Sequence, residues 1–169
     1  MQVALTFDDG PGDVTGALLD ALARHEARAT FYWLGELVAD REEVVRRAVR
    51  EGHEIGVHGW THVDHRDDPE ARAREVARTA ALLFSICGVH PKRFRPPYGA
   101  TNAALEAAVA EYGLETVLWD VDPRDWEDPG PEVVRDRTLE ALRPGAVVLL
   151  HERPETVEAL ALILGELYG

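Results

Sequence analysis

Cysteine is almost absent from this sequence, because Cys87 is the only one among 169 residues. A single thiol excludes a disulfide within the chain and is compatible with a reducing compartment. The first residues, Met1–Leu5, lead straight into a motif-rich segment without the pattern of a signal peptide, so we expect a cytoplasmic protein.

Long apolar runs are missing as well. The nearest candidate covers residues 145–151, which is far fewer than the roughly 18 residues that a membrane-spanning helix requires. We therefore expect no membrane span and interpret this run as a buried strand.

Positive charge is scarce, since 18 Lys and Arg residues stand against 31 Asp and Glu residues and give a net charge of -13. Nucleic-acid binding needs a basic face that neutralises phosphates, and no basic cluster is evident, so we expect no nucleic-acid partner. With 46% apolar and 29% charged residues, the composition is that of a soluble globular protein. No linker, repeat or low-complexity tract divides the chain, and we predict one domain over residues 1–169.

Short apolar runs alternate with segments of helical periodicity, which is typical of βα units around a parallel sheet or barrel. The predicted strands are Gln2–Phe7, Ala29–Leu34, Glu54–Val57, Arg93–Arg95, Glu115–Val121 and Ala146–His151. The predicted helices are Val14–Arg24, Asp40–Glu51, Pro69–Ile86, Asn102–Tyr112, Pro131–Leu142 and Thr156–Leu167. Asn102 and Pro131 suit helix starts, and Gly52, Gly88 and Gly113 suit positions just after helix ends.

Polar clusters follow the carboxyl ends of the predicted strands. These clusters are Asp8–Asp9, His58–His62, Arg95–Tyr98, Asp122–Trp126 and His151. Functional sites of α/β proteins lie at this end because loops from separate parallel strands converge there. The sequence therefore predicts one pocket built from all of these clusters.

The first two clusters have the residue types of a metal site. One of the adjacent carboxylates Asp8 and Asp9 could ligate a cation while the other stays free as a base, because a divalent ion relieves the repulsion between close anions. His58 and His62 are four residues apart, a spacing that puts both on one face if the chain turns helically there. With one aspartate they complete a three-ligand set that leaves a coordination position open, as in catalytic zinc sites. His65 is the second choice as a ligand because of its spacing from His62.

The other clusters suit proton transfer and substrate binding. Arg95–Gly99 contains two prolines and forms a stiff turn, on which an arginine could orient the free aspartate and a backbone N–H could face an oxyanion. Residues 120–126 combine three acids with Trp126, an aromatic suited to the face of a sugar or to an apolar floor. His151 could protonate a leaving amine, particularly if a carboxylate such as Asp125 orients it.

With these motifs in this order, the chain resembles the polysaccharide deacetylase family, carbohydrate esterase family 4, which includes the nodulation chitooligosaccharide deacetylases. The resemblance covers about residues 3–151 and includes each of the family's five motifs. It implies a distorted (β/α) barrel with about six or seven parallel strands. It also implies metal-dependent removal of acetyl from an N-acetylated sugar, either a chitooligosaccharide or peptidoglycan N-acetylglucosamine. The implied cofactor is a divalent metal, with zinc first and cobalt or nickel next.

The resemblance implies a role for each motif residue. Asp8 would be the catalytic base and His151 the catalytic acid, while Asp9, His58 and His62 would ligate the metal.

Two further residues would support these groups, since the resemblance implies that Arg95 orients the base and that Asp125 tunes the acid. The amide of Tyr98 would help to form the oxyanion hole, and Leu149 would contribute to a pocket for the acetyl methyl group. The implied substrate-binding residues are Pro97, Tyr98, Trp126 and Leu149.

The chain departs from the family pattern in two places. The family usually has Ser or Thr after the first histidine ligand, where the hydroxyl braces the loop, but this chain has Gly59. Either metal affinity is reduced or another group such as Thr61 replaces the brace. The family's final strand is expected just beyond Leu167–Gly169, so we expect a barrel that is open at that edge.

Two alternative functions remain at this point. The absence of a signal peptide suggests a deformylase or deacetylase of a lipid-linked or small cytosolic amide. Gly59 and the short C-terminal end suggest an inactive carbohydrate-binding or scaffold protein that kept the motifs.

Overall fold

The sheet at the centre of the fold is parallel and curls into part of a barrel. In the computed structural model, which describes residues 2–169, its strands are β1 (Ala4–Gly10), β2 (Ala29–Trp33), β3 (Glu54–Val57), β4 (Arg93–Phe94), β5 (Glu115–Thr116) and β6 (Val147–His151). They are hydrogen-bonded in the order β5-β4-β3-β2-β1-β6, and every pairing is parallel. The predicted α/β class with about six or seven parallel strands is confirmed, and the six strands of the described residues form a curled half-barrel.

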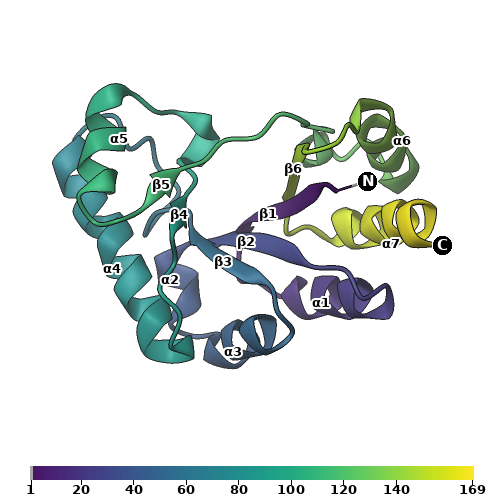
Figure 1. Ribbon diagram of the computed structural model, residues 1–169, viewed down its shortest axis with the longest axis horizontal. Helices are drawn as coiled ribbons and strands as arrows, with labels where there is room; N and C mark the ends of the chain where they lie inside the picture. The colour runs from purple at the N-terminus through teal and green to yellow at the C-terminus, as the bar shows by residue number, and fades with distance from the viewer. Residues whose placement is uncertain (1) are drawn as a thin grey trace.

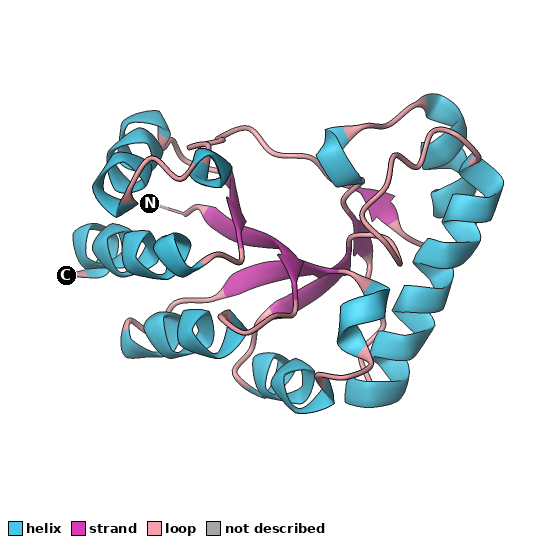
Figure 2. Cartoon of the chain, turned by 180° about the vertical axis from the view of Figure 1, so that it is seen from behind, coloured by secondary structure: helices cyan, strands magenta, loops and turns pink. Residues whose placement is uncertain are grey.

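Helices form the outer layer of the molecule. Figure 1 shows them in an arc outside the strands, and Figure 2 shows the same arrangement from behind. They are α1 (Thr15–Arg24), α2 (Gly35–Val38), α3 (Glu42–Arg50), α4 (Pro69–Cys87), α5 (Ala103–Ala110), α6 (Pro131–Ala141) and α7 (Pro154–Tyr168), with short 3-10 turns η1 (Pro97–Gly99) and η2 (Asp125–Glu127). Between residues 2 and 169, no helix is long and apolar enough to cross a membrane.

Some helix boundaries follow from local capping chemistry. The side chain of Asn102 accepts a hydrogen bond from the backbone N–H of Leu105 at 2.9 Å and begins α5 as predicted. Gly88, at φ 73°, ends α4 in the left-handed conformation that glycine adopts without strain. The short helix α2 was not predicted, because four residues are too few to show a helical period.

The predicted strand Glu115–Val121 is wrong in its extent. Only its first two residues form β5 beside β4, and Val121 instead pairs with Val148 of β6. The N–H of Val121 donates to the carbonyl of Val147 at 3.1 Å, and the carbonyl of Val121 accepts from Leu149 at 2.9 Å. Because the sheet is curved, one extended segment reaches both of its edges.

Strand β1 lies inside the sheet and carries the first motif. Its register places Asp8 opposite His151 of β6 and opposite Tyr32 of β2. The register shifts between Asp8 and Gly10, and Asp9 has a φ of 76°. Successive side chains of a regular strand point to opposite faces, but this bulge lets both adjacent carboxylates reach one cavity.

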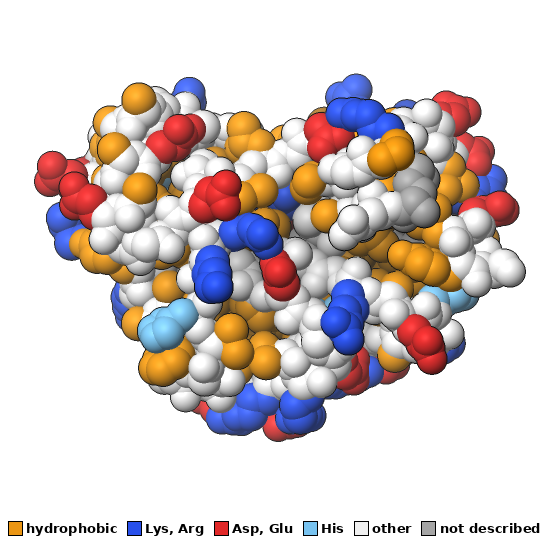
Figure 3. Space-filling view, in the orientation of Figure 1, with side chains coloured by type: hydrophobic (Ala, Val, Ile, Leu, Met, Phe, Trp, Pro, Cys, Tyr) orange, Lys and Arg blue, Asp and Glu red, His pale blue; other side chains and the backbone are white. Residues whose placement is uncertain are grey.

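Charged side chains of both signs are interspersed on the face shown in Figure 3. That face has no large patch of basic side chains, which agrees with the net charge of -13.

Candidate active site

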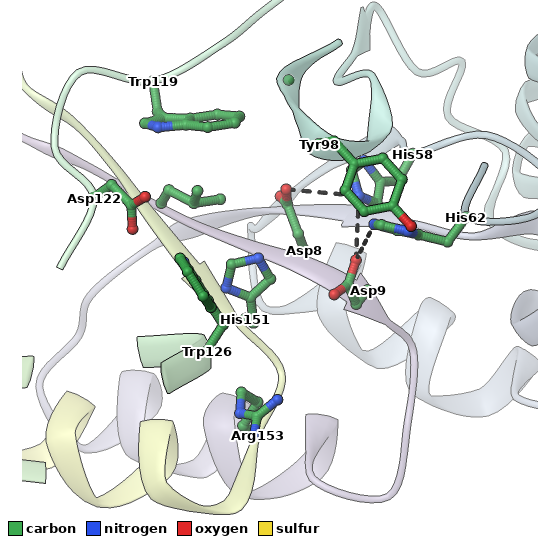
Figure 4. A pocket seen from close by; sticks show the side chains of 12 residues that line it. Asp8, Asp9, His58, His62, Tyr98, Trp119, Asp122, Trp126, His151 and Arg153 are labelled. Atoms are coloured by element: carbon green, nitrogen blue, oxygen red, sulfur yellow. Dashed lines mark ion pairs between the residues drawn. The ribbon is translucent and has the colours of Figure 1, made fainter. Parts of the chain in front are cut away.

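A cavity of about 470 Å³ lies at the carboxyl ends of the strands. Residues of all five motif clusters line this cavity (Figure 4), and none of the lining residues lies in an α-helix. The lining residues are Asp8, Asp9, His58, His62, Tyr98, Gly99, Trp119, Asp122, Trp126, Leu149, His151 and Arg153. A cavity of this size suits a small ligand or part of a polymer. The predicted convergence of the motifs is thus present in the structure.

Asp9, His58 and His62 form a group that could hold a metal ion. The Nε2 atoms of His58 and His62 lie 3.2 and 3.3 Å from Oδ1 of Asp9. This Oδ1 atom is buried and has no hydrogen-bond partner among the described residues, and a buried acceptor without a donor is costly unless a cation satisfies it. The residues therefore fit a divalent metal with an open coordination position.

The ring of His58 is oriented by a backbone carbonyl on the side away from Asp9. Its Nδ1 lies 2.6 Å from the carbonyl oxygen of Arg95, so a proton on Nδ1 donates there and the Nε2 lone pair is left for a metal. Burial opposes protonation of this ring, but the charges of Asp8 and Asp9 outweigh that effect and raise the pKa of His58. The same contacts with His58 lower the pKa of Asp9 in spite of its desolvation.

His65 does not belong to the metal-binding group. The residue is fully buried, and its Nδ1 lies 2.7 Å from the carbonyl oxygen of Val63. The structure thus agrees with its place as the second choice among the histidines.

Asp8 lies beside the metal-binding group and is held by Arg95. An Nη1–H of Arg95 donates to Oδ1 of Asp8 at 2.8 Å, and the guanidinium is completely buried. The same nitrogen donates to the hydroxyl of Thr6 at 2.7 Å. The other oxygen of Asp8, Oδ2, lies 3.7 Å from Nε2 of His58 and remains free to accept a proton.

His151 lies on the other side of Asp8 from the histidine pair (Figure 4). Its Nδ1 and its backbone N are both 2.7 Å from the carboxylate of Asp125, which also accepts from the hydroxyl of Thr156 at 2.7 Å. Burial lowers the pKa of His151, but the hydrogen bond and charge of Asp125 outweigh burial, so the net pKa lies above 6.5. His151 is therefore equipped to hold a proton and release it to a substrate.

Aromatic side chains form the walls of the cavity. Tyr98 is 73% exposed at one side, with its ring 4.6 Å from that of His62, and Trp126 is 47% exposed on the opposite side. Tyr98 has a φ of 61°, a conformation that costs a non-glycine residue roughly 1 kcal/mol or more and is common at functional sites. Leu149 lines the floor, whereas Pro97 is buried behind Tyr98 and does not line the cavity.

Three residues near the site were missed from the sequence. Trp119 and Arg153 line the cavity, and the carboxylate of Glu152 packs against Gly10 next to Asp9. Trp119 was interpreted as part of a regular strand, although an aromatic just before the acidic loop could have been included in that cluster. Glu152 and Arg153 follow His151 directly, and only their position beyond a strand end could have suggested a role.

Glu152 supports the turn that follows Asp9. Its carboxylate accepts hydrogen bonds from Nε1 of Trp33 at 2.6 Å and from the hydroxyl of Thr15. It also occupies the space in which a Cβ at position 10 would lie, so a larger residue than Gly10 would displace this carboxylate. Desolvation raises the pKa of Glu152 to about 7, although its hydrogen bonds act in the opposite direction.

A curled parallel sheet with a candidate metal centre beside Asp8 and His151 at its rim is typical of hydrolytic α/β enzymes. Within that class, the family model described as polysaccharide deacetylase matches residues 1–117. The chain therefore belongs to the polysaccharide deacetylase family.

Individual relatives agree with this assignment. The chain is 39% identical to a chitooligosaccharide deacetylase of Bradyrhizobium sp. (strain ANU 289), over 96% of this chain and 83% of the relative. It is 37% identical to a peptidoglycan-N-acetylglucosamine deacetylase of Bacillus cereus, over 98% and 81%. The structure of a family 4 carbohydrate esterase from Streptomyces lividans in complex with acetate matches with a TM-score of 0.92 and 38% identity, over 98% and 86%.

Glu152→Gln is expected to change how stability depends on pH. The pKa of Glu152 is about 7 in the native state against an ordinary 4.5, so the native state keeps a proton that the unfolded chain has already released. The free energy of unfolding therefore falls as pH rises through this range, by about 3 kcal/mol at 1.36 kcal/mol per pKa unit. Glutamine cannot titrate and removes this loss.

Denaturant unfolding of the metal-free protein between about pH 4.5 and about pH 8.5 measures the effect. The stability of Glu152→Gln relative to the wild type should increase with pH, whereas Glu158→Gln on the exposed side of α7 should show no such trend. Equal pH dependence in the wild type and Glu152→Gln would contradict the prediction.

Proposed function

We propose that the protein hydrolyses the N-acetyl amide of an N-acetylated sugar, a chitooligosaccharide or peptidoglycan N-acetylglucosamine, and releases acetate. The observation that carries this proposal is a pair of side chains, Asp8 and His151, that are each held by a buried partner and line the same cavity as the metal-binding group. Asp8 is fixed by Arg95 at 2.8 Å, and His151 is fixed by Asp125 at 2.7 Å. A proposed base and a proposed acid thus line one cavity, where one can accept and the other donate a proton during amide hydrolysis.

The proposed cofactor is a divalent metal held by Asp9, His58 and His62, with zinc first and cobalt or nickel as alternatives. When bound, such an ion lowers the pKa of a coordinated water from about 15.7 to near 7 and polarises the substrate carbonyl.

The chain's own residues would carry the proton transfers. Oδ2 of Asp8 would accept the proton of the attacking water, because Oδ1 is already occupied by Arg95. Nε2 of His151 would protonate the departing amine, because its Nδ1 is bonded to Asp125. The raised pKa of His151 supports this role, since a general acid must carry its proton before the bond breaks.

The remaining residues would bind and orient the substrate. The backbone N–H of Tyr98 would stabilise the developing oxyanion, and buried Leu149 would contact the acetyl methyl group. Trp126 and Trp119, which line the cavity, would pack against sugar rings. Substrates with several sugar units are favoured because Tyr98 and Trp126 extend the contact surface beyond the metal-binding group.

Asp8→Asn and His151→Ala are expected to lower kcat for acetate release from N-acetylglucosamine oligomers by about 10²- to 10⁴-fold, the usual contribution of a general acid or base. Both variants should still bind metal. Asp136→Asn in α6 and His25→Ala just after α1 change the same residue types at positions that do not line the cavity, and they serve as matched controls. Wild-type rates in folded, metal-loaded Asp8→Asn or His151→Ala would refute the proposal.

Removal of the metal is expected to abolish acetate release. Dialysis against a chelator should stop turnover, and zinc, cobalt or nickel should restore it. Asp9→Asn and His62→Ala should weaken metal binding by at least about 100-fold, because each removes a ligand rather than a supporting group. Full activity of a protein shown by elemental analysis to be metal-free would contradict the metal assignment.

Asp125→Asn is expected to shift the alkaline limb of the pH–rate profile to lower pH. The charge and hydrogen bond of Asp125 raise the pKa of His151, so a neutral asparagine lowers that pKa and His151 loses its proton at a lower pH. The profile of kcat against pH measures the shift separately from the general loss of rate. An unchanged alkaline limb would show that another group is the acid.

A further inference from the structure

The loop that carries His58 and His62 is fixed to two neighbouring elements through Gly59. The carbonyl oxygen of Gly59 accepts hydrogen bonds from the N–H of Gly35 at 3.0 Å and from the hydroxyl of Thr79 at 3.1 Å. These bonds hold one side of the loop, in the segment between the two histidines. These bonds do not support the other side of the loop, where the family pattern has a hydroxyl-bearing side chain.

His65 fills the space on that side. A Cβ atom built on Gly59 would lie 2.7 Å from both Cε1 and Nε2 of His65, and Gly59 has a φ of 95°. Real Cβ atoms do not approach ring atoms this closely, so any side chain at position 59 and the imidazole at position 65 exclude each other.

The imidazole of His65 is itself held firmly. It is completely buried, its Nδ1 is 2.7 Å from the carbonyl oxygen of Val63, and its ring centroid lies 5.6 Å from that of Phe94 in β4. With the proton on Nδ1, the ring edge that faces Gly59 carries a buried Nε2 without a hydrogen-bond partner among the described residues. This edge therefore contacts the loop by shape rather than by a hydrogen bond.

We propose that His65 is a positioning residue for the metal-binding loop and forms a coupled pair with Gly59, in which the buried ring replaces the usual hydroxyl brace. The glycine provides the room and tolerates the positive φ, while the ring presses against the loop between His58 and His62. The inference rests on the proposed metal site for its functional meaning. The hydroxyl of Thr61 makes no recorded hydrogen bond within residues 2–169, so that residue is not the replacement.

A double-mutant cycle with Gly59→Ser and His65→Asn tests the coupling. Asparagine keeps an amide N–H where Nδ1 donates to Val63, but it lacks the ring edge that contacts Gly59. The readout is the affinity for Co²⁺ or Zn²⁺ in competition with a chromophoric chelator, together with the visible absorption spectrum of bound Co²⁺. Neither readout requires turnover.

Gly59→Ser alone should weaken metal binding by about 10- to 100-fold, the usual effect of disturbing the support of a metal ligand. The double variant should bind metal about tenfold more tightly than Gly59→Ser alone, since the collision is removed, so the effects are not additive. Strain from the positive φ and the close approach of the Cβ to the carbonyl oxygen of Thr61 at 3.0 Å remain in both variants and account for incomplete recovery. Thr61→Ala is the control and should leave the affinity unchanged.

The same cycle measured as the Tm of the metal-free protein separates this inference from the proposed cofactor. His65→Asn should raise the Tm of Gly59→Ser while lowering the Tm of the wild type. A chain that binds no metal but shows this sign reversal overturns the metal assignment and supports the coupling. If His65→Asn lowers affinity and Tm equally in both backgrounds, the coupling is wrong.

Discussion

The site depends above all on one buried cation, the guanidinium of Arg95. It donates to Asp8 and Thr6 of β1 and to the carbonyl of Leu118 at 2.9 Å, while the backbone carbonyl of Arg95 holds the ring of His58. Removing one partner of a buried ion pair typically costs about 3 to 5 kcal/mol, because the other charge is left unpaired in a medium of low dielectric. One residue therefore locates the proposed base, a proposed metal ligand and the segment that links the two edges of the sheet.

A second constraint is the bulge at Asp9. In a regular strand Asp8 and Asp9 would point to opposite faces, and only one could reach the cavity. The positive φ of Asp9 and the register shift before Gly10 break this alternation, and the carboxylate of Glu152 packs against the turn that follows. The different surroundings of the two carboxylates follow from this geometry, since Asp8 meets Arg95 and Asp9 meets the histidine pair.

The sequence-based predictions succeeded where local physics dominates. Apolar runs, helical periodicity and capping residues such as Asn102 and Gly88 predicted most elements to within a few residues. They failed for Glu115–Val121, because an extended segment looks the same whether it pairs with one neighbour or crosses between two. The role of Glu152 was missed because its partners Trp33 and Thr15 are far from it in the sequence, so no local pattern shows that its carboxylate is buried.

By itself, the sequence determined the parallel α/β architecture, the family, and the set of motif residues that would share one rim, because strand ends and motif order are properties of the chain. Only the tertiary structure decided which partner each charged group meets. It paired Arg95 with Asp8 and Asp125 with His151, and it placed the ring of His65 against Gly59. Such pairings join residues far apart in the chain, and distances of a few ångströms between them arise only when the sheet curls and the loops at its rim pack together.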